Sequence, residues 1–268
     1  MYAFEFQQPT TLRQAVSMLA KSEDAKLLAD GHSLIPVMKL RLASPGTIID
    51  LSQVKELTGV ELKGRSLVIG AMTRHREVAN SPIALEAMPG LAAVPASIGD
   101  PHVRNRGTIG GSVANNDPNA DYPAACLGLG ATIITTKRKI SADEFFTGMF
   151  ETALEPDEII TKISFPLIKK CGYEKFKHPA SGFALVGVFV SKASSGVRVA
   201  VTGAGANGVF RVPSFEEALS KRFVPKSLEG LTIPQDGMNS DIHAGAEYRA
   251  HLVGVMARRA TAKAVANG

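Results

Sequence analysis

Two short loops of small residues most constrain what this chain can fold into. The first is residues 29–33, Ala-Asp-Gly-His-Ser, and the second is residues 108–112, Thr-Ile-Gly-Gly-Ser. In each loop the small residues expose backbone N–H groups, and glycine permits close approach and a positive φ because it has no Cβ. A pyrophosphate needs N–H donors in a concave array, so both loops suit the binding of one.

Each loop is also compatible with an ordinary tight turn, because short glycine-rich segments are common between elements. Neither loop contains the GxGxxG pattern of dinucleotide-binding proteins or the P-loop pattern of nucleotide hydrolases. The loops therefore indicate phosphate binding only together with other features of the chain, and they do not support a Rossmann fold.

Composition describes an ordinary globular protein. The chain has 268 residues, 45% of them hydrophobic and 21% charged, which is enough for one to three small domains. No apolar run approaches the roughly 20 residues of a membrane span, and the first six residues do not resemble a signal peptide. We expect a cytoplasmic protein without a membrane span. The net charge of +5 is spread thinly and without interleaved aromatic residues, which argues against nucleic-acid binding.

Metal and cluster ligands are scarce in the sequence. The only two cysteines, Cys126 and Cys171, are too far apart for a CxxC pair, so the chain cannot by itself supply four thiolates to an iron–sulfur cluster. The histidines show no metal-ligand spacing with carboxylates or cysteines. We therefore expect no metal site in this chain, and any iron–sulfur cluster would lie on a partner.

The apolar periodicity predicts an α+β fold in three parts: residues 1–56 as a βαβ lobe, 57–166 as an α+β lobe, and 167–268 as three antiparallel strands with helices. The predicted helices cover 11–21, 34–42, 123–129 and 246–266, with another beginning at 214. The predicted strands cover 26–29, 47–51, 132–135, 173–177, 183–191 and 197–203, with a hairpin over 59–70.

A long segment, residues 98–124, strongly resembles the second flavin-binding signature of the carbon monoxide dehydrogenase medium-subunit and xanthine dehydrogenase FAD-subunit family. In that signature a T-I-G-G core, here 108–111, is followed by an A-D-x-P segment, here 120–123. Residues 29–36 resemble the first signature, A-G-G-x-S-L-x-P. The likeness extends to 156–160, 173–176 and 246–252, and therefore to nearly the whole chain.

The resemblance implies a two-lobed FAD-binding domain of the vanillyl-alcohol-oxidase type with a C-terminal domain, and an FAD extended between the lobes. The two loops would hold the pyrophosphate, with Asn115 beside it. Asp121 would accept hydrogen bonds from ribose or ribityl hydroxyls, and Lys175 would stabilise the reduced flavin ring. The implied cofactor-binding residues are Ala29, Asp30, Gly31, His32, Ser33, Leu34, Thr108, Ile109, Gly110, Gly111, Ser112, Asn115, Asp121, Ile160 and Lys175.

Two of these residues also have plainer interpretations. Lys175 fits an ordinary solvated lysine on a strand, whose stem packs while its ammonium stays in water. His32 could donate to a phosphate, but the family tolerates other polar residues at this position, which favours a role for its backbone alone. His75 is not among the implied cofactor-binding residues, and like the other histidines it shows no metal-ligand spacing.

The resemblance also implies partners. A large subunit would carry molybdopterin and oxidise the substrate, a small subunit would carry two 2Fe-2S clusters, and the FAD of this chain would pass electrons to an external acceptor. The complex would be a dimer of such heterotrimers. No catalytic acid or base is then needed here, in line with the lack of a paired-carboxylate or Ser/His/Asp pattern.

Two other functions fit the same sequence. One is a self-contained flavin oxidoreductase of the same fold, and the other is a docking or assembly module that holds flavin weakly. Asp30 favours the second alternative, because it replaces the first glycine of the A-G-G signature and its charge would repel a pyrophosphate. We expect its carboxylate to hydrogen-bond its own backbone while turned to solvent.

Overall fold

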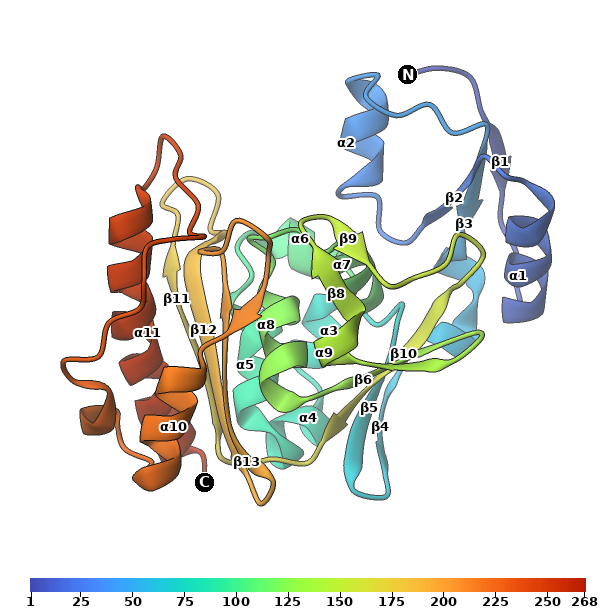
Figure 1. Ribbon diagram of the computed structural model, residues 1–268. Coiled ribbons are helices and arrows are strands. Elements are labelled where there is room, and N and C mark those ends of the chain that lie inside the picture. Colours follow the sequence, from blue (N-terminus) through green and yellow to red (C-terminus); the bar gives the residue numbers. More distant parts are fainter.

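Three sheets of the computed structural model, which describes residues 1–268, follow one another along the chain (Figure 1). Their strand orders are β1-β3-β2, β4-β5-β10-β6-β7 and β11-β12-β13-β14, and β8 and β9 form a separate hairpin. The strands are β1 (Glu5–Gln7), β2 (Ala25–Leu28), β3 (Thr47–Asp50), β4 (Val60–Lys63), β5 (Ser66–Gly70), β6 (Thr132–Thr135), β7 (Lys139–Ser141), β8 (Phe146–Gly148), β9 (Glu151–Thr152), β10 (Ile160–Pro166), β11 (Cys171–Lys177), β12 (Ala184–Ala193), β13 (Gly196–Thr202) and β14 (Phe210–Arg211). The helices are α1 (Leu12–Lys21), α2 (Leu34–Lys39), α3 (His75–Ala79), α4 (Pro82–Ala87), α5 (Pro89–Ser97), α6 (Pro101–Arg106), α7 (Ile109–Asn115), α8 (Asp121–Leu129), α9 (Ala142–Phe145), α10 (Pro213–Lys221) and α11 (Ala246–Ala266), with 3-10 turns η1 (Leu51–Gln53), η2 (Lys55–Leu57) and η3 (Pro225–Leu228).

The first sheet is a small parallel unit. β3 pairs in parallel with both β1 and β2. α1 begins at a capping box, in which the Thr11 hydroxyl accepts from Gln14 N and the Gln14 side chain accepts from Thr11 N. Ala15 and Leu19 of α1 are buried in one cluster with Ile49 of β3. The predicted βαβ unit and its first helix are therefore confirmed.

α2 is shorter than the predicted helix over 34–42. It ends at Lys39, because Arg41 adopts a left-handed φ of 61° and Leu42 N donates back to Val37 O. Such a left-handed residue after a helix is usually glycine, so an arginine there gives no signal of the helix end. The predicted last turn of this helix is wrong.

The second sheet forms the centre of the molecule in Figure 1. The antiparallel hairpin β4–β5 confirms the hairpin predicted over 59–70, and β10 pairs with β5 on one side and β6 on the other. The helices α3 to α7 occupy residues 75–115, where the sequence predicts no helix. Each has five to nine residues, too few for a helical period to stand out.

The third sheet has one more strand than predicted. β11, β12 and β13 confirm the three antiparallel strands, and the two-residue β14 is added at the edge of β13. A strand this short has no alternation to detect. α11 covers β11 and β12 on the outer face, over the predicted 246–266. None of the helices combines the length and the apolarity that crossing a membrane requires.

α8 lies between the second and third sheets (Figure 1). All nine of its residues are buried, and it contacts β12 and β13 on one side and β10 on the other. Gly128 permits this fit, because a Cβ there would lie 2.7 Å from the Phe189 ring. The helix therefore holds its first residue, Asp121, between the second and third sheets. The domain boundaries at 56 and 166 stay a prediction.

Candidate functional site

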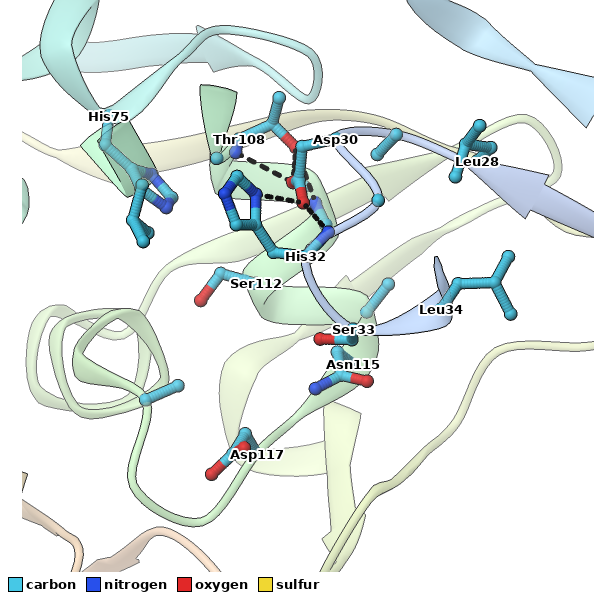
Figure 2. Close-up of a pocket in the computed structure, with 18 of the residues that line it drawn as sticks. Leu28, Asp30, His32, Ser33, Leu34, His75, Thr108, Ser112, Asn115 and Asp117 are labelled. Carbon is cyan, nitrogen blue, oxygen red and sulfur yellow. Dashed lines mark hydrogen bonds and ion pairs between the residues drawn. The ribbon is translucent and has the colours of Figure 1, made fainter. Parts of the chain in front are cut away.

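One cavity of about 1180 Å³ is bounded by segments that precede or follow strands of all three sheets. Figure 2 shows part of its wall. It is larger than the roughly 300–1,000 Å³ typical of sites for small ligands, so it has room for an extended one. Most of the candidate cofactor-binding residues line it: Ala29, Asp30, Gly31, His32, Ser33, Leu34, Thr108, Gly110, Gly111, Ser112, Asn115, Asp121 and Ile160. Ile109 and Lys175 do not.

The first loop presents free backbone donors to the cavity. Gly31 has a φ of 84°, which glycine adopts without strain and which turns the chain from β2 into α2. The N–H groups of Gly31, Ser33 and Leu34 donate no hydrogen bond within the chain, and the Ser33 hydroxyl has no partner in it either. This loop therefore leaves three backbone donors unused within the chain, and their role in binding a pyrophosphate stays a prediction.

The second loop differs from that expectation, because Ile109 to Ser112 form the first turn of α7. Neither Gly110 nor Gly111 has a positive φ, so the positive φ expected at Gly111 is wrong. The N–H groups of the loop are also already bonded, from Thr108 to Asp30 Oδ2, from Ile109 to Thr73 O, from Gly110 to Ala71 O, from Gly111 to Thr108 Oγ1 and from Ser112 to Thr108 O.

The second loop therefore offers side chains to the cavity. Ser112 and Asn115 lie on α7, and neither side chain makes a hydrogen bond within the chain. Figure 2 shows both along the cavity wall with Ser33 from the first loop. Ile109 is fully buried in the core instead, and a Cβ at Gly110 would lie 2.6 Å from Ala71 O. These two residues fix α7 against β5.

Asp30 joins the two loops. Its Oδ2 accepts from the Thr108 N–H at 3.0 Å and from the Thr108 hydroxyl at 3.1 Å, and its Oδ1 accepts from His32 N at 2.9 Å. The side chain is only 12% exposed. The expected hydrogen bond to its own backbone region is confirmed. The expected orientation toward solvent is wrong, because the second loop supplies donors that the sequence of the first loop could not reveal.

Asp121 is a buried carboxylate with two strong donors. Tyr173 OH donates to it at 2.5 Å, and Lys175 Nζ lies 2.9 Å from it. Burial raises the pKa of the Asp121 carboxyl, and the charge of Lys175 and the Tyr173 hydroxyl oppose that rise. Lys175 is itself buried, so it is not a solvated lysine. It stands behind Asp121, which alone of this group lines the cavity.

His75 lines the cavity although the sequence gives no reason to select it. Burial lowers the pKa of its imidazole to about 4, an effect that the nearby Asp30 opposes. Its Nδ1 atom is buried without a hydrogen-bond partner, and its ring lies 5.4 Å from that of Tyr122. A lone histidine at the start of a short helix carries no pattern, so only the fold shows that it lies near Asp30 and His32.

Two further segments form part of the wall: one begins the flavin-signature segment 98–124, and the other, residues 180–183, has no signal of its own in the sequence. Residues 98–103 contribute from the start of α6, and residues 180–183 contribute from the loop between β11 and β12, with Phe183 about half exposed. The second segment brings the third sheet to the cavity. No group of three or more His, Cys, Asp or Glu side chains is placed to hold a metal ion.

Comparisons with known proteins show which proteins this chain resembles. Residues 2–168 match the model of a family described as the FAD binding domain in molybdopterin dehydrogenase. The carbon monoxide dehydrogenase medium chain of Hydrogenophaga pseudoflava is 34% identical over 96% of this chain and 95% of its own length. The nicotine 6-hydroxylase medium subunit of Paenarthrobacter nicotinovorans is 36% identical over 98% and 97%.

The same fold occurs in a solved structure of carbon monoxide dehydrogenase from Hydrogenophaga pseudoflava that lacks the Mo-pyranopterin moiety of the molybdenum cofactor. The TM-score is 0.88, with 35% identity, and the alignment covers 99% of this chain and 98% of that one. The predicted α+β fold class and the predicted resemblance are thereby confirmed. The chain belongs to the FAD-binding medium subunits of the molybdenum hydroxylase family, whose members are subunits of oxidoreductase complexes.

Proposed function

We propose that this chain relays electrons through an FAD in the cavity, taking them from 2Fe-2S clusters on a partner subunit and passing them to an external acceptor. The main evidence for a cofactor site is a set of polar groups that make no hydrogen bond within the chain. They are the N–H groups of Gly31, Ser33 and Leu34 and the side chains of Ser33, Ser112 and Asn115. A pyrophosphate, with many acceptor oxygens, matches this set of donors.

Other residues of the site suit the remaining parts of FAD. We assign Asp121 to hydroxyl groups of the ribose or ribityl chain, because a carboxylate accepts about four hydrogen bonds and Tyr173 and Lys175 use only some of that capacity. We assign Ile160 to the apolar lining around the flavin ring. Lys175 acts on the ring through its positive charge from behind Asp121, without contact, since it does not line the cavity.

FAD suits this junction because it takes electrons singly and gives up one or two of them. The residues of the chain then need only bind the cofactor, orient it and hold its surroundings. His75 is the most strongly perturbed histidine of the cavity, and its lowered pKa keeps it neutral at physiological pH. It therefore adds no charge of its own beside the pyrophosphate.

Substrate oxidation belongs to a partner in this proposal. Relatives of similar identity to this chain are named for carbon monoxide dehydrogenase and for nicotine 6-hydroxylase, so the likeness of this chain to them does not indicate one substrate. We propose a large molybdopterin subunit and a small iron–sulfur subunit as partners, in a dimer of heterotrimers. The cytoplasmic location stays a prediction.

Purifying the chain from its native host, both alone and with its co-purifying subunits, tests the relay. We expect the complex to contain molybdenum, iron and FAD, and its flavin absorbance to bleach under anaerobic conditions when substrate is added. We expect the isolated chain with FAD to show no such bleaching with any substrate of the complex. An isolated chain that retains FAD and oxidises the substrate unaided would instead establish a self-contained oxidoreductase.

A further inference from the structure

The carboxylate of Asp30 makes a contact that spans the cavity floor, between residues 78 positions apart in the sequence. Its Oδ2 accepts two hydrogen bonds from Thr108, one from the backbone N–H at 3.0 Å and one from the hydroxyl at 3.1 Å. Asp30 follows the first sheet, and Thr108 caps α7 beside the second. Figure 2 shows the two side chains facing each other beside His32.

The first loop holds this carboxylate in place from its own side. Oδ1 accepts from the backbone N–H of His32 at 2.9 Å and lies 3.1 Å from His32 Nδ1. With the two bonds from Thr108, both oxygens of Asp30 are fully engaged, near the limit of four that a carboxylate accepts. An oriented, fully bonded carboxylate is a fixed part of the structure.

A second Asp-x-His turn in the same cavity wall shows what the contact with Thr108 adds. Asp100 Oδ1 accepts from His102 N at 2.6 Å and lies 2.8 Å from His102 Nδ1, as in the first loop. The Asp100 side chain has no donor from another segment and is 54% exposed, against 12% for Asp30. The turn alone therefore leaves such a carboxylate in solvent, and Thr108 accounts for the burial of Asp30.

Gly111 makes the space that the contact needs. A Cβ built on it would lie 2.7 Å from Asp30 Oδ2 and 2.9 Å from Thr108 Oγ1. Contacts this short do not occur for real side chains, so any other residue at this position would separate the carboxylate from the Thr108 donors. The glycine, the threonine and the aspartate form one local unit.

We propose that Asp30 is a positioning residue. Its hydrogen bonds to Thr108, called the clasp from here on, hold the two loops together and arrange the cofactor-binding groups before the cofactor enters. With the clasp closed, the residues with free N–H groups, Gly31, Ser33 and Leu34, line the same cavity as Ser112 and Asn115. The clasp rests on the proposed function in one respect, namely that the ligand it prepares for is FAD. Without the clasp, binding must also order the two loops, which lowers both the affinity and the association rate.

Titration of the apo chain with FAD, followed by flavin fluorescence, tests the clasp in the variants Asp30→Asn and Thr108→Val and in their combination. Asparagine keeps the shape of aspartate but removes the charge. It also replaces one acceptor oxygen with an NH₂ group, which cannot accept the hydrogen bond of a backbone N–H. We expect each single change to weaken FAD binding about tenfold, which is about 1.4 kcal/mol, and to slow association. Because the two residues form one contact, their effects should not be additive. We expect the FAD affinity of the double variant to equal that of the single variant with the lower affinity.

Two matched variants separate the clasp from general damage. Thr108→Ser keeps the hydroxyl and the N–H, so we expect it to bind FAD as the unchanged protein does. Asp24 also accepts from a backbone N–H, that of Gly46 at 2.8 Å, but within the first lobe and outside the cavity. We expect Asp24→Ala to leave FAD affinity unchanged. Additive effects of the two clasp variants, or a failure of Thr108→Ser to bind, would overturn the clasp.

The negative charge of Asp30 could have the opposite effect on FAD binding, because it repels a pyrophosphate. If repulsion of the pyrophosphate dominated, Asp30→Asn would bind FAD more tightly, with a gain that shrinks at high salt, and the clasp would be overturned.

Thermal unfolding of the apo proteins is a readout that does not involve FAD. We expect Asp30→Asn and Thr108→Val each to lower Tm, and the double variant to lower Tm by less than the sum of the two single effects. A chain that shows this coupling but binds no FAD would contradict the proposed function and retain the clasp, whereas additive losses would overturn the clasp.

Discussion

The ammonium group of Lys175 lies 2.9 Å from the carboxylate of Asp121, and both side chains are almost completely buried. Asp121 begins α8 and Lys175 lies on β11, so the pair joins the helix that lines the cavity to the third sheet. Tyr173, on the same strand, donates to the same carboxylate at 2.5 Å. The third sheet therefore fixes the orientation of a carboxylate that faces the cavity.

Changing Lys175 to Met should destabilise the protein strongly. Removing one partner leaves the carboxylate of Asp121 buried without its counter-charge, a change that typically costs about 3–5 kcal/mol. Urea unfolding of the apo protein measures the free energy of unfolding. We expect the double variant Asp121→Asn with Lys175→Met to recover much of the loss, because neither charge then remains. Equal losses in the single and double variants would contradict this coupling.

Changing Asp121 to Ala should weaken FAD binding by about 1–3 kcal/mol, the usual cost of leaving buried partners unpaired. Equilibrium titration of the apo chain with FAD gives the affinity, and the far-ultraviolet circular dichroism of the variant provides the control for folding. A folded variant with unchanged affinity would restrict Asp121 to the structural pairing with Lys175 and Tyr173.

Changing Gly111 to Val should abolish FAD retention while α7 stays folded. The reason is crowding and not backbone conformation, because Gly111 has a helical φ and its added Cβ would meet Asp30 and Thr108. Gly245 is a matched control, since nothing lies within 4 Å of a Cβ there. We expect Gly245→Val to keep its FAD through gel filtration. A Gly111→Val protein that also keeps it would contradict the crowding.

The stability of the apo protein should fall as the pH drops from about 6.5 toward 4, in part because of His75. Its pKa is lowered from 6.5 to about 4 in the folded chain, so in this window the unfolded chain binds more protons. The contribution of His75 is complete above pH 6.5, and its loss amounts to about 3 kcal/mol at low pH. Tm measured across this range should depend less on pH in His75→Asn than in the unchanged protein. Parallel pH profiles would show that His75 does not carry this effect.

Long, regular segments of the fold could be predicted from the sequence. α1 and α11 have caps or apolar patterns that extend over several turns, and β12 and β13 alternate over enough residues to be recognised. The helices between His75 and Asn115 could not be predicted in this way, because each is short and its position depends on packing against the second sheet. Tertiary contacts, and not local pattern, decide such segments.

Features of the candidate site that are local to one loop could be predicted from the sequence. The first loop has its donors as expected, since the φ of Gly31 is a local property. The orientation of Asp30 could not be predicted, because it depends on Thr108. The roles of Gly110 and Gly111 could not be predicted either, because they depend on close contacts with Ala71 and Asp30, which are distant in the sequence. The pairing of Lys175 with Asp121 likewise joins residues 54 positions apart.

The central claim is that this chain holds one FAD in the cavity bounded by segments next to its three sheets. Visible absorption of the native complex, with the flavin then released by acid and identified, measures this directly. We predict one FAD for each copy of this chain, and loss of that flavin from a complex that carries Gly111→Val but still assembles. A native complex that is catalytically active without FAD in this chain, or a Gly111→Val complex with its full flavin content, would contradict the account.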